Sequence, residues 1–186
     1  MSAESQSWSS TSNISPKSPP APSFLSLPPA ALVTNRRLDL AVKARFFGSL
    51  LHGGEDKDAE RVYRWHIATR IDSNRRAGLG MDTGKARHPD LYVIEAKNLL
   101  ASMQRQGFRL DCAIPLDPDG ELLNGSHRTA SALALGLASV PVVKGNRKVF
   151  APAWDEGWFI ANKCPADDLE RIRKDFAALN GLRNAG

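Results

Sequence analysis

Four consecutive residues, Gly125-Ser126-His127-Arg128, combine groups that are suited to holding phosphates. They stand where a helix is expected to begin, and the free N–H groups and partial positive charge of a helix start attract anions. Gly125 lets the backbone come close to a ligand because it has no Cβ atom. Ser126 and Thr129 add hydroxyl groups. Arg128 is a permanent fork-shaped cation, and His127 can donate to an anion or act as acid or base. The stretch therefore predicts a cradle for two or three phosphates.

A purely structural interpretation of the same residues stays open. Ser126 could be only the N-cap of the helix. Arg128 could pair with Asp117 or Asp119 in the acidic turn before it. A lone histidine such as His127 is more often structural than catalytic. Short motifs match by chance, so the surrounding elements must decide between the two interpretations.

Acidic residues elsewhere are candidates for handling an acceptor hydroxyl or a metal ion. Asp72 is expected just after a strand, where site residues are common, and an exposed turn is the alternative. The nearby Arg70, Arg75 and Arg76 could gather a phosphate-bearing substrate. Asp117 and Asp119 are expected mainly to shape a turn, although two carboxylates beside a phosphate site also suit Mg²⁺.

Residue periodicity predicts the elements that position these groups. In chain order they are a helix within residues 30–51, a strand over 61–71, an amphipathic helix over 89–106, two strands joined by a tight turn over 111–123, a helix over 126–135, a strand over 139–144 and a charged helix over 167–180. Trp154, Trp158 and Phe159 are expected to anchor the last helix, with a stacking wall for a base or sugar as the alternative.

Bulk properties limit the class of protein. The 186 residues carry a net charge of +5 and are 42% hydrophobic, so one core can form and an anionic ligand fits. Two cysteines and no histidine cluster predict no disulfide framework or zinc site. Residues 1–30 are rich in Ser and Pro and are expected to be a disordered tail, or alternatively an export leader. A cytoplasmic protein without a membrane span is expected, and an exported one is the alternative.

The order of elements over residues 91–143, with Gly-x-His-Arg opening a helix, resembles the ParB/sulfiredoxin-like superfamily. The resemblance implies an α+β fold with a small mixed sheet and packed helices, a core over 31–150 and a C-terminal helical extension over 151–186. It also implies that a triphosphate, from ATP or CTP with Mg²⁺, meets residues Asn124–Thr129. Glu95 is the match to the base of kinases in the superfamily, although a solvent-facing glutamate beside Lys97 is the alternative.

Two departures from the superfamily limit what carries over. Ser126 stands where sulfiredoxins have a reactive Cys, which argues against sulfinic acid repair. Asn124 stands where the kinases have Asp, and an amide cannot act as a base. No helix-turn-helix domain of the partition proteins is evident.

The sequence therefore predicts a nucleotide-dependent phosphotransferase acting on a small molecule or sugar. His127 and Arg128 would hold the phosphates, and Asp72 or Glu95 would handle the acceptor hydroxyl. The alternatives are a nucleotide-binding switch or DNA-associated module without group transfer, a nuclease, and an exported effector. Nucleic-acid binding has little support in the sequence. The sequence does not indicate an oligomeric state.

Overall fold

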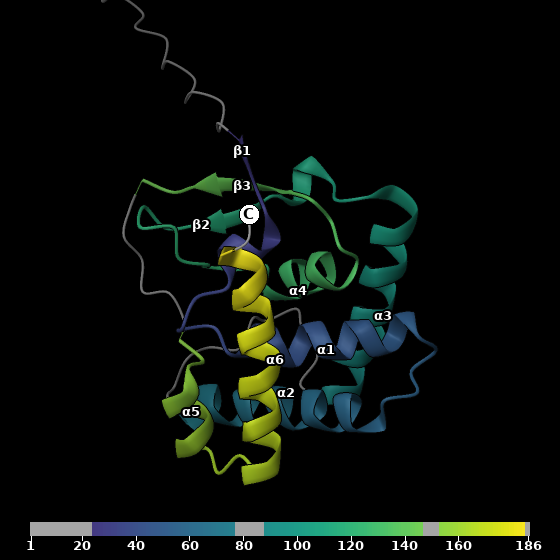
Figure 1. Ribbon diagram of the computed structural model, residues 1–186, viewed down its shortest axis with the longest axis vertical. Coiled ribbons are helices and arrows are strands. Elements are labelled where there is room, and N and C mark those ends of the chain that lie inside the picture. The colour runs from purple at the N-terminus through teal and green to yellow at the C-terminus, as the bar shows by residue number, and fades with distance from the viewer. Residues whose placement is uncertain (1–23, 77–87, 147–152, 185–186) are drawn as a thin grey trace, which may run out of the picture.

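The computed structural model describes residues 24–76, 88–146 and 153–184, which form six α-helices, three strands and two short 3-10 helices (Figure 1). In chain order these are β1 (Phe24–Leu27), η1 (Pro29–Leu32), α1 (Asp39–Leu51), α2 (Lys57–Arg76), α3 (Pro89–Gln106), η2 (Leu110–Cys112), β2 (Ile114–Leu116), α4 (Ser126–Ala134), β3 (Val140–Lys144), α5 (Glu156–Ala161) and α6 (Ala166–Asn184). The predicted α+β fold with a C-terminal helix is confirmed.

The sheet is small and mixed, with the strand order β1-β3-β2. β1 runs antiparallel to β3 and β2 runs parallel to it. Val140 and Val142 alternate with less buried residues along β3, as expected for a strand with one face on the core. Of the two strands predicted over 111–123, only β2 forms, and a single bridge between Leu116 and Leu122 replaces the second.

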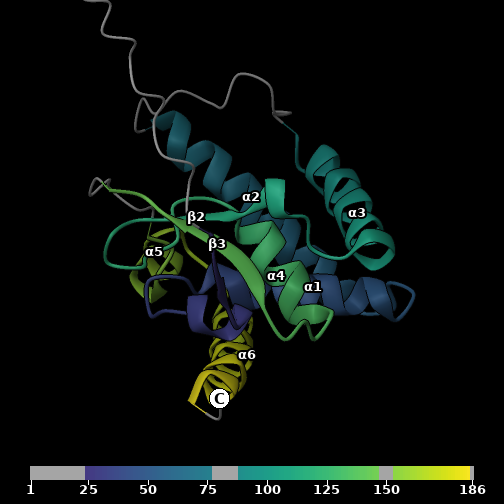
Figure 2. The same ribbon diagram turned by 90° about the horizontal axis from the view of Figure 1, so that it is seen from above.

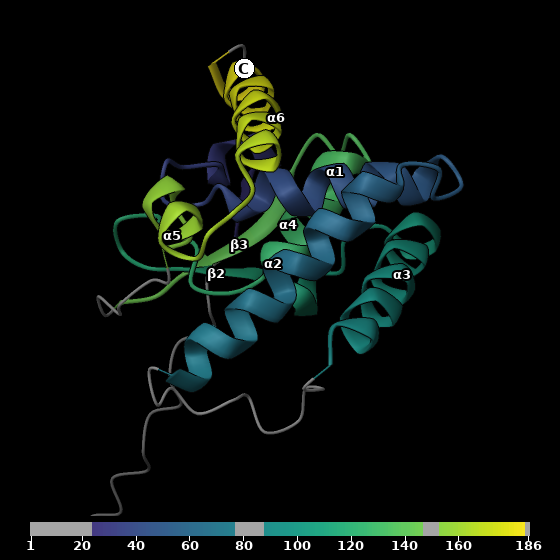
Figure 3. The ribbon, with the colours of Figure 1, turned by 90° about the horizontal axis from the view of Figure 1, so that it is seen from below.

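The helices surround α1, which contributes Leu40, Phe46 and Phe47 to the core. α4 lies next to α1, below the sheet in the view of Figure 1. Figures 2 and 3 show α3 and α6 on opposite sides of α1. The start of α4 is therefore reached by residues of α1 from one side and of α3 from another. None of the helices in the described part of the chain is long and apolar enough to cross a membrane.

The strand predicted over residues 61–71 is wrong, because this segment lies inside the 20-residue helix α2. The strand prediction followed the spacing of Val62, Trp65 and Ile67. The residues of α2 that are buried recur three or four positions apart, which is the helical period: Ala59, Val62, Tyr63, His66, Ile67 and Ile71. Burial against α1 and α3 selects the helix over the local strand propensity of the aromatic and β-branched residues.

The predicted end of the N-terminal tail also needs correction. The Ser/Pro-rich tail was expected to extend to residue 30, but Phe24–Leu27 pairs with β3 and Pro29 and Ala30 are buried. Backbone groups of this segment gain partners from a strand more than a hundred residues away, which local composition cannot indicate. Residues 1–23 lie outside the described part of the chain.

The C-terminal aromatic residues anchor the last helices, as predicted. Phe159 is fully buried and Trp158 packs edge-on against it, with ring centroids 5.1 Å apart. Leu169 and Ile172 of α6 are buried in the same core. Residues 153–184 therefore continue the packed structure.

Candidate functional site

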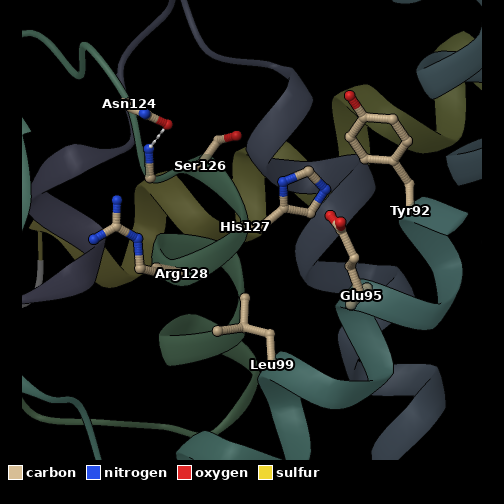
Figure 4. Close-up of a pocket in the computed structure, with 9 residues that line it drawn as sticks. Tyr92, Glu95, Leu99, Asn124, Ser126, His127 and Arg128 are labelled. Carbon is tan, nitrogen blue, oxygen red and sulfur yellow. Dashed lines mark hydrogen bonds between the residues drawn. The ribbon is translucent and has the colours of Figure 1, made fainter. Parts of the chain in front are cut away.

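A pocket of about 250 Å³ lies between α3 and the start of α4 (Figure 4). Its described lining residues are Tyr92, Glu95, Ala96, Leu99, Asn124, Gly125, Ser126, His127 and Arg128. One wall is thus the predicted phosphate cradle, and the facing wall is one stripe of α3. The structure brings Glu95 to the same pocket as the Gly125–Arg128 motif.

Gly125 shapes the start of α4. Its φ angle of 93° lies in the left-handed region, and a Cβ atom there would stand 3.2 Å from Nη2 of Arg128. Gly125 occupies the N-cap position without a side-chain cap, so Ser126 is the first helical residue and not the N-cap. Thr129 donates its hydroxyl to the carbonyl of Gly125 at 3.1 Å, which turns this predicted ligand-binding hydroxyl inward. The helix start therefore keeps uncapped N–H groups at the pocket.

Arg128 lines the pocket and also supports the loop before β2. Its Nη1 donates to the carbonyl oxygens of Cys112 and Ala113. Asp117, an expected alternative partner, instead accepts from the backbone N–H of Glu121 at 2.8 Å. Arg128 thus has a structural contact beside its place in the predicted phosphate cradle.

A buried group of three charges lies behind Ser126. Arg37 donates to both oxygens of Asp39, at 2.8 and 3.0 Å, and Lys43 pairs with the same carboxylate. Nζ of Lys43 also lies 3.0 Å from Oγ of Ser126. All three charged side chains are at most 2% exposed. Two cations thus share one carboxylate, and one of them, Lys43, contacts the pocket residue Ser126.

These surroundings lower the pKa values of both Lys43 and Asp39, for different reasons. Burial lowers the pKa of Lys43 from 10.5 to about 8, although the charge of Asp39 acts against this. Burial alone would raise the pKa of Asp39, but the charges of Arg37 and Lys43 outweigh it and hold that pKa well below its ordinary value. Asp39 therefore remains ionised, while Lys43 is the group that can lose its charge.

One face of α2 completes the surroundings of His127. Oη of Tyr63 lies 2.9 Å from Nε2 of His127, and the guanidinium of Arg70 lies 5.1 Å from the ring centroid of Tyr92. Burial, with the charges of Lys43 and Arg70, lowers the pKa of His127 well below its ordinary value. His127 is therefore neutral at pH 7, and offers one ring N–H and one acceptor nitrogen.

The other predicted site residues lie elsewhere. Asp72 does not line the pocket: it is exposed on α2 and pairs with Arg75 at 3.3 Å. Arg76 donates to Asn162 at 3.2 Å. Because the segment is a helix and not a strand, Asp72 is not carried to a strand end, and of the three arginines only Arg70 reaches a pocket residue, Tyr92.

The predicted metal ligands do not fit Mg²⁺ at the pocket. Neither Asp117 nor Asp119 lines it, and a carboxylate oxygen of Asp117 accepts a backbone N–H in the turn. Within residues 24–76, 88–146 and 153–184, no three His, Cys, Asp or Glu side chains are grouped to hold a metal ion. Glu95 is the one carboxylate among the described lining residues.

Sequence reasoning missed Arg37, Asp39, Lys43 and Tyr63. One signal was present, since Asp39 and Lys43 are four residues apart in a predicted helix. Trp154, predicted to act as an anchor, lies with its ring centroid 5.1 Å from the guanidinium of Arg37 and 5.6 Å from Nζ of Lys43. It therefore covers the buried cations.

Comparisons of the chain with protein-family models, curated proteins and solved structures found no match. The resemblance to the ParB/sulfiredoxin-like superfamily therefore stays a prediction.

Proposed function

We propose that the protein binds the phosphate groups of a nucleoside triphosphate, ATP or CTP, at the start of α4 and transfers one phosphate to a small molecule or sugar. The observation that carries the proposal is the pocket itself. It joins the uncapped start of α4 with Ser126 and Arg128 on one wall and the carboxylate of Glu95 on the other. Phosphoryl transfer needs cations, an anion cradle and a group that orients the acceptor.

The charges around the pocket support an anionic ligand. Lys43 and Arg37 exceed the single charge of Asp39, and Arg70 and Arg128 lie at the pocket's sides. An excess of cations in a partly dehydrated environment is stabilised when a phosphate enters. A pocket of about 250 Å³ is smaller than those that enclose drug-sized ligands, which are about 300–1,000 Å³. It would therefore enclose the phosphates and leave the base outside.

Glu95 is the proposed acceptor-orienting group. It lies on α3, is exposed, and faces the pocket between Tyr92 and Leu99 (Figure 4). An exposed carboxylate can accept a proton from an incoming hydroxyl and release it to water. Mg²⁺ would be brought by the phosphates of the nucleotide and would neutralise their charge.

A nucleotide-binding switch without group transfer is the second candidate. The observation that favours it is the position of Asp72 outside the pocket, which leaves Glu95 as the one carboxylate on the described walls. Formation of nucleoside diphosphate with a metabolite mixture supports transfer. Nucleotide binding without any diphosphate supports the switch.

The placement of the phosphates is tested with Ser126→Asp. A carboxylate at a helix start favours the fold, and here it would also lie near Lys43, but it repels phosphate. Calorimetry with ATP or CTP and Mg²⁺ should show binding at least ~10-fold weaker than in the wild type. The matched control is Ser139→Asp, at an exposed position outside the pocket. Equal affinity of all three proteins would refute the placement.

A further inference from the structure

We infer that Ser126 is a nucleophile with Lys43 as its general base, so that the transfer passes through a phosphoserine. The inference rests on the proposed function, because the phosphoryl donor is the nucleoside triphosphate in the pocket. It adds a covalent step that binding alone does not require. The residues that carry it are on two helices, α1 and α4, which lie side by side.

The geometry gives Lys43 one route to the pocket. Its side chain is fully buried, and its hydrogen bonds within the described part of the chain are to Asp39 and Ser126. Ser126 lines the pocket, and its Oγ is 3.0 Å from Nζ of Lys43. A proton on the Ser126 hydroxyl can therefore move directly to the lysine amine from a residue that lines the pocket.

The surroundings of Lys43 decide its protonation state. Asp39 and the ring of Trp154 favour the ammonium, whereas burial and the cations of Arg37 and Arg70 favour the neutral amine. The two nearby imidazoles, His66 and His127, are neutral at pH 7 because burial lowers their pKa values well below 6.5. The balance lowers the pKa of Lys43 to about 8, so a neutral amine is accessible near physiological pH.

The first step conserves atoms and charge. Oγ of Ser126 attacks the γ-phosphorus, its proton passes to Nζ of Lys43, and the bond from the γ-phosphorus to the bridging oxygen breaks, which releases nucleoside diphosphate. In the second step an acceptor hydroxyl attacks the phosphoserine. The Oγ–P bond breaks, Lys43 returns its proton to Oγ, and Glu95 takes the proton of the acceptor.

The product of the first step suits its position. A phosphoserine at the first residue of a helix is stabilised by the free N–H groups of that helix. The new charge on Lys43 lies beside it, so the ammonium and phosphate form an ion pair as they appear. Near pH 7 most molecules hold Lys43 as the ammonium, which favours binding of the phosphates, and the fraction with a neutral Lys43 is the reactive form that accepts the proton.

The experiment uses the full chain, γ-labelled ATP or CTP and Mg²⁺, without an acceptor, so that the phosphoenzyme accumulates. We expect label on Ser126 by mass spectrometry, none in Ser126→Ala, and a formation rate that rises with pH and levels off above about 8. Lys43→Arg keeps the charge but cannot act as a base, and should slow labelling at least ~100-fold. Lys43→Met removes both the positive charge and the base. Lys97→Arg, exposed on α3, is the matched control.

Parallel calorimetry separates this inference from the proposed function. Nucleotide binding without phosphoserine overturns the covalent step and leaves the proposed function standing. Absence of nucleotide binding overturns both. Undiminished labelling in Lys43→Arg or Lys43→Met, with wild-type circular dichroism, overturns the role of Lys43 as base.

Discussion

Lys43 and Arg45 stand two residues apart on α1, yet they occupy opposite environments. The side chain of Arg45 is 27% exposed and pairs with Asp56 at 2.7 Å and with Asp175 at 3.6 Å. Lys43 is fully buried and, among the residues that the structure describes, shares the carboxylate of Asp39 with Arg37. The surface cation Arg45 thus has two acidic partners, whereas the two buried cations share one.

This difference separates a solvated charge from the buried charge that we propose to be functional. Surface pairs contribute little to stability because water screens them, and nothing is left for a ligand to neutralise. A buried excess of positive charge is costly unless an anion reaches it. Among the described residues, the excess lies behind Ser126, beside a pocket that is open to a phosphate.

Removing the shared carboxylate should give the largest effect. Asp39→Asn leaves Arg37 and Lys43 buried without a counter-charge, and should lower the free energy of unfolding by ~3–5 kcal/mol. Denaturant unfolding measures it. The surface counterpart Asp56→Asn should cost no more than ~1 kcal/mol. Equal losses in the two variants would show that the buried cluster has no special role.

The pH dependence of stability should show the burial of Lys43. The pKa of Lys43 in the folded protein is about 8, below the ordinary 10.5 of the unfolded chain. Between these values the unfolded state binds more protons, so the contribution of Lys43 rises with pH from 8 to 10.5, by at most ~3 kcal/mol. Below pH 8 the full destabilisation that results from burying the charged lysine is present.

Subtracting the stability curve of Lys43→Met from that of the wild type isolates this contribution. Other groups that titrate in the same range, such as Cys164 with its pKa raised to about 11 by burial, cancel in the difference. A difference that stays flat from pH 7 to 11 contradicts the lowered pKa of Lys43.

Gly125→Ala should lower the stability of the fold by less than Asp39→Asn does. The left-handed backbone and the approach of a Cβ atom to Arg128 together should cost ~1–3 kcal/mol. Gly136→Ala is the control, since Gly136 has a φ of 65° but no neighbour within 4 Å of its added Cβ. Thermal unfolding compares the two variants. A larger loss of stability in Gly136→Ala would show that the side chain of Arg128 moves aside without cost.

His66→Phe should give the smallest change, and in the stabilising direction. His66 is fully buried, stacks on Phe159, and neither of its ring nitrogens has a hydrogen-bond partner in the described part of the chain. Phenylalanine leaves no polar atoms unpaired, and this gain should exceed the cost of fitting its slightly larger ring, so the free energy of unfolding should rise by ~1 kcal/mol. A loss of stability would indicate that the imidazole binds a water or a ligand.

Local signals predicted one half of the site and missed the other. Gly125 and Arg128 follow a turn and open a helix, so residue types indicated them as candidates. Glu95 lies in a helix predicted from residue spacing, but it became a candidate only through the resemblance to the superfamily. Tyr63 was missed because aromatic and β-branched residues in α2 imitate a strand. The burial of Lys43 depends on α4 and Trp154, more than eighty residues away, and no local pattern indicates such contacts.

The central claim is that the buried excess of positive charge holds phosphates, and calorimetry of Lys43→Met against Arg45→Met tests it most directly. Both variants lose one cation from α1, one buried and one on the surface. We predict that Lys43→Met binds ATP or CTP with Mg²⁺ at least ~10-fold more weakly than the wild type, while Arg45→Met keeps its affinity within about twofold. Equal affinities in the two folded variants would contradict the claim.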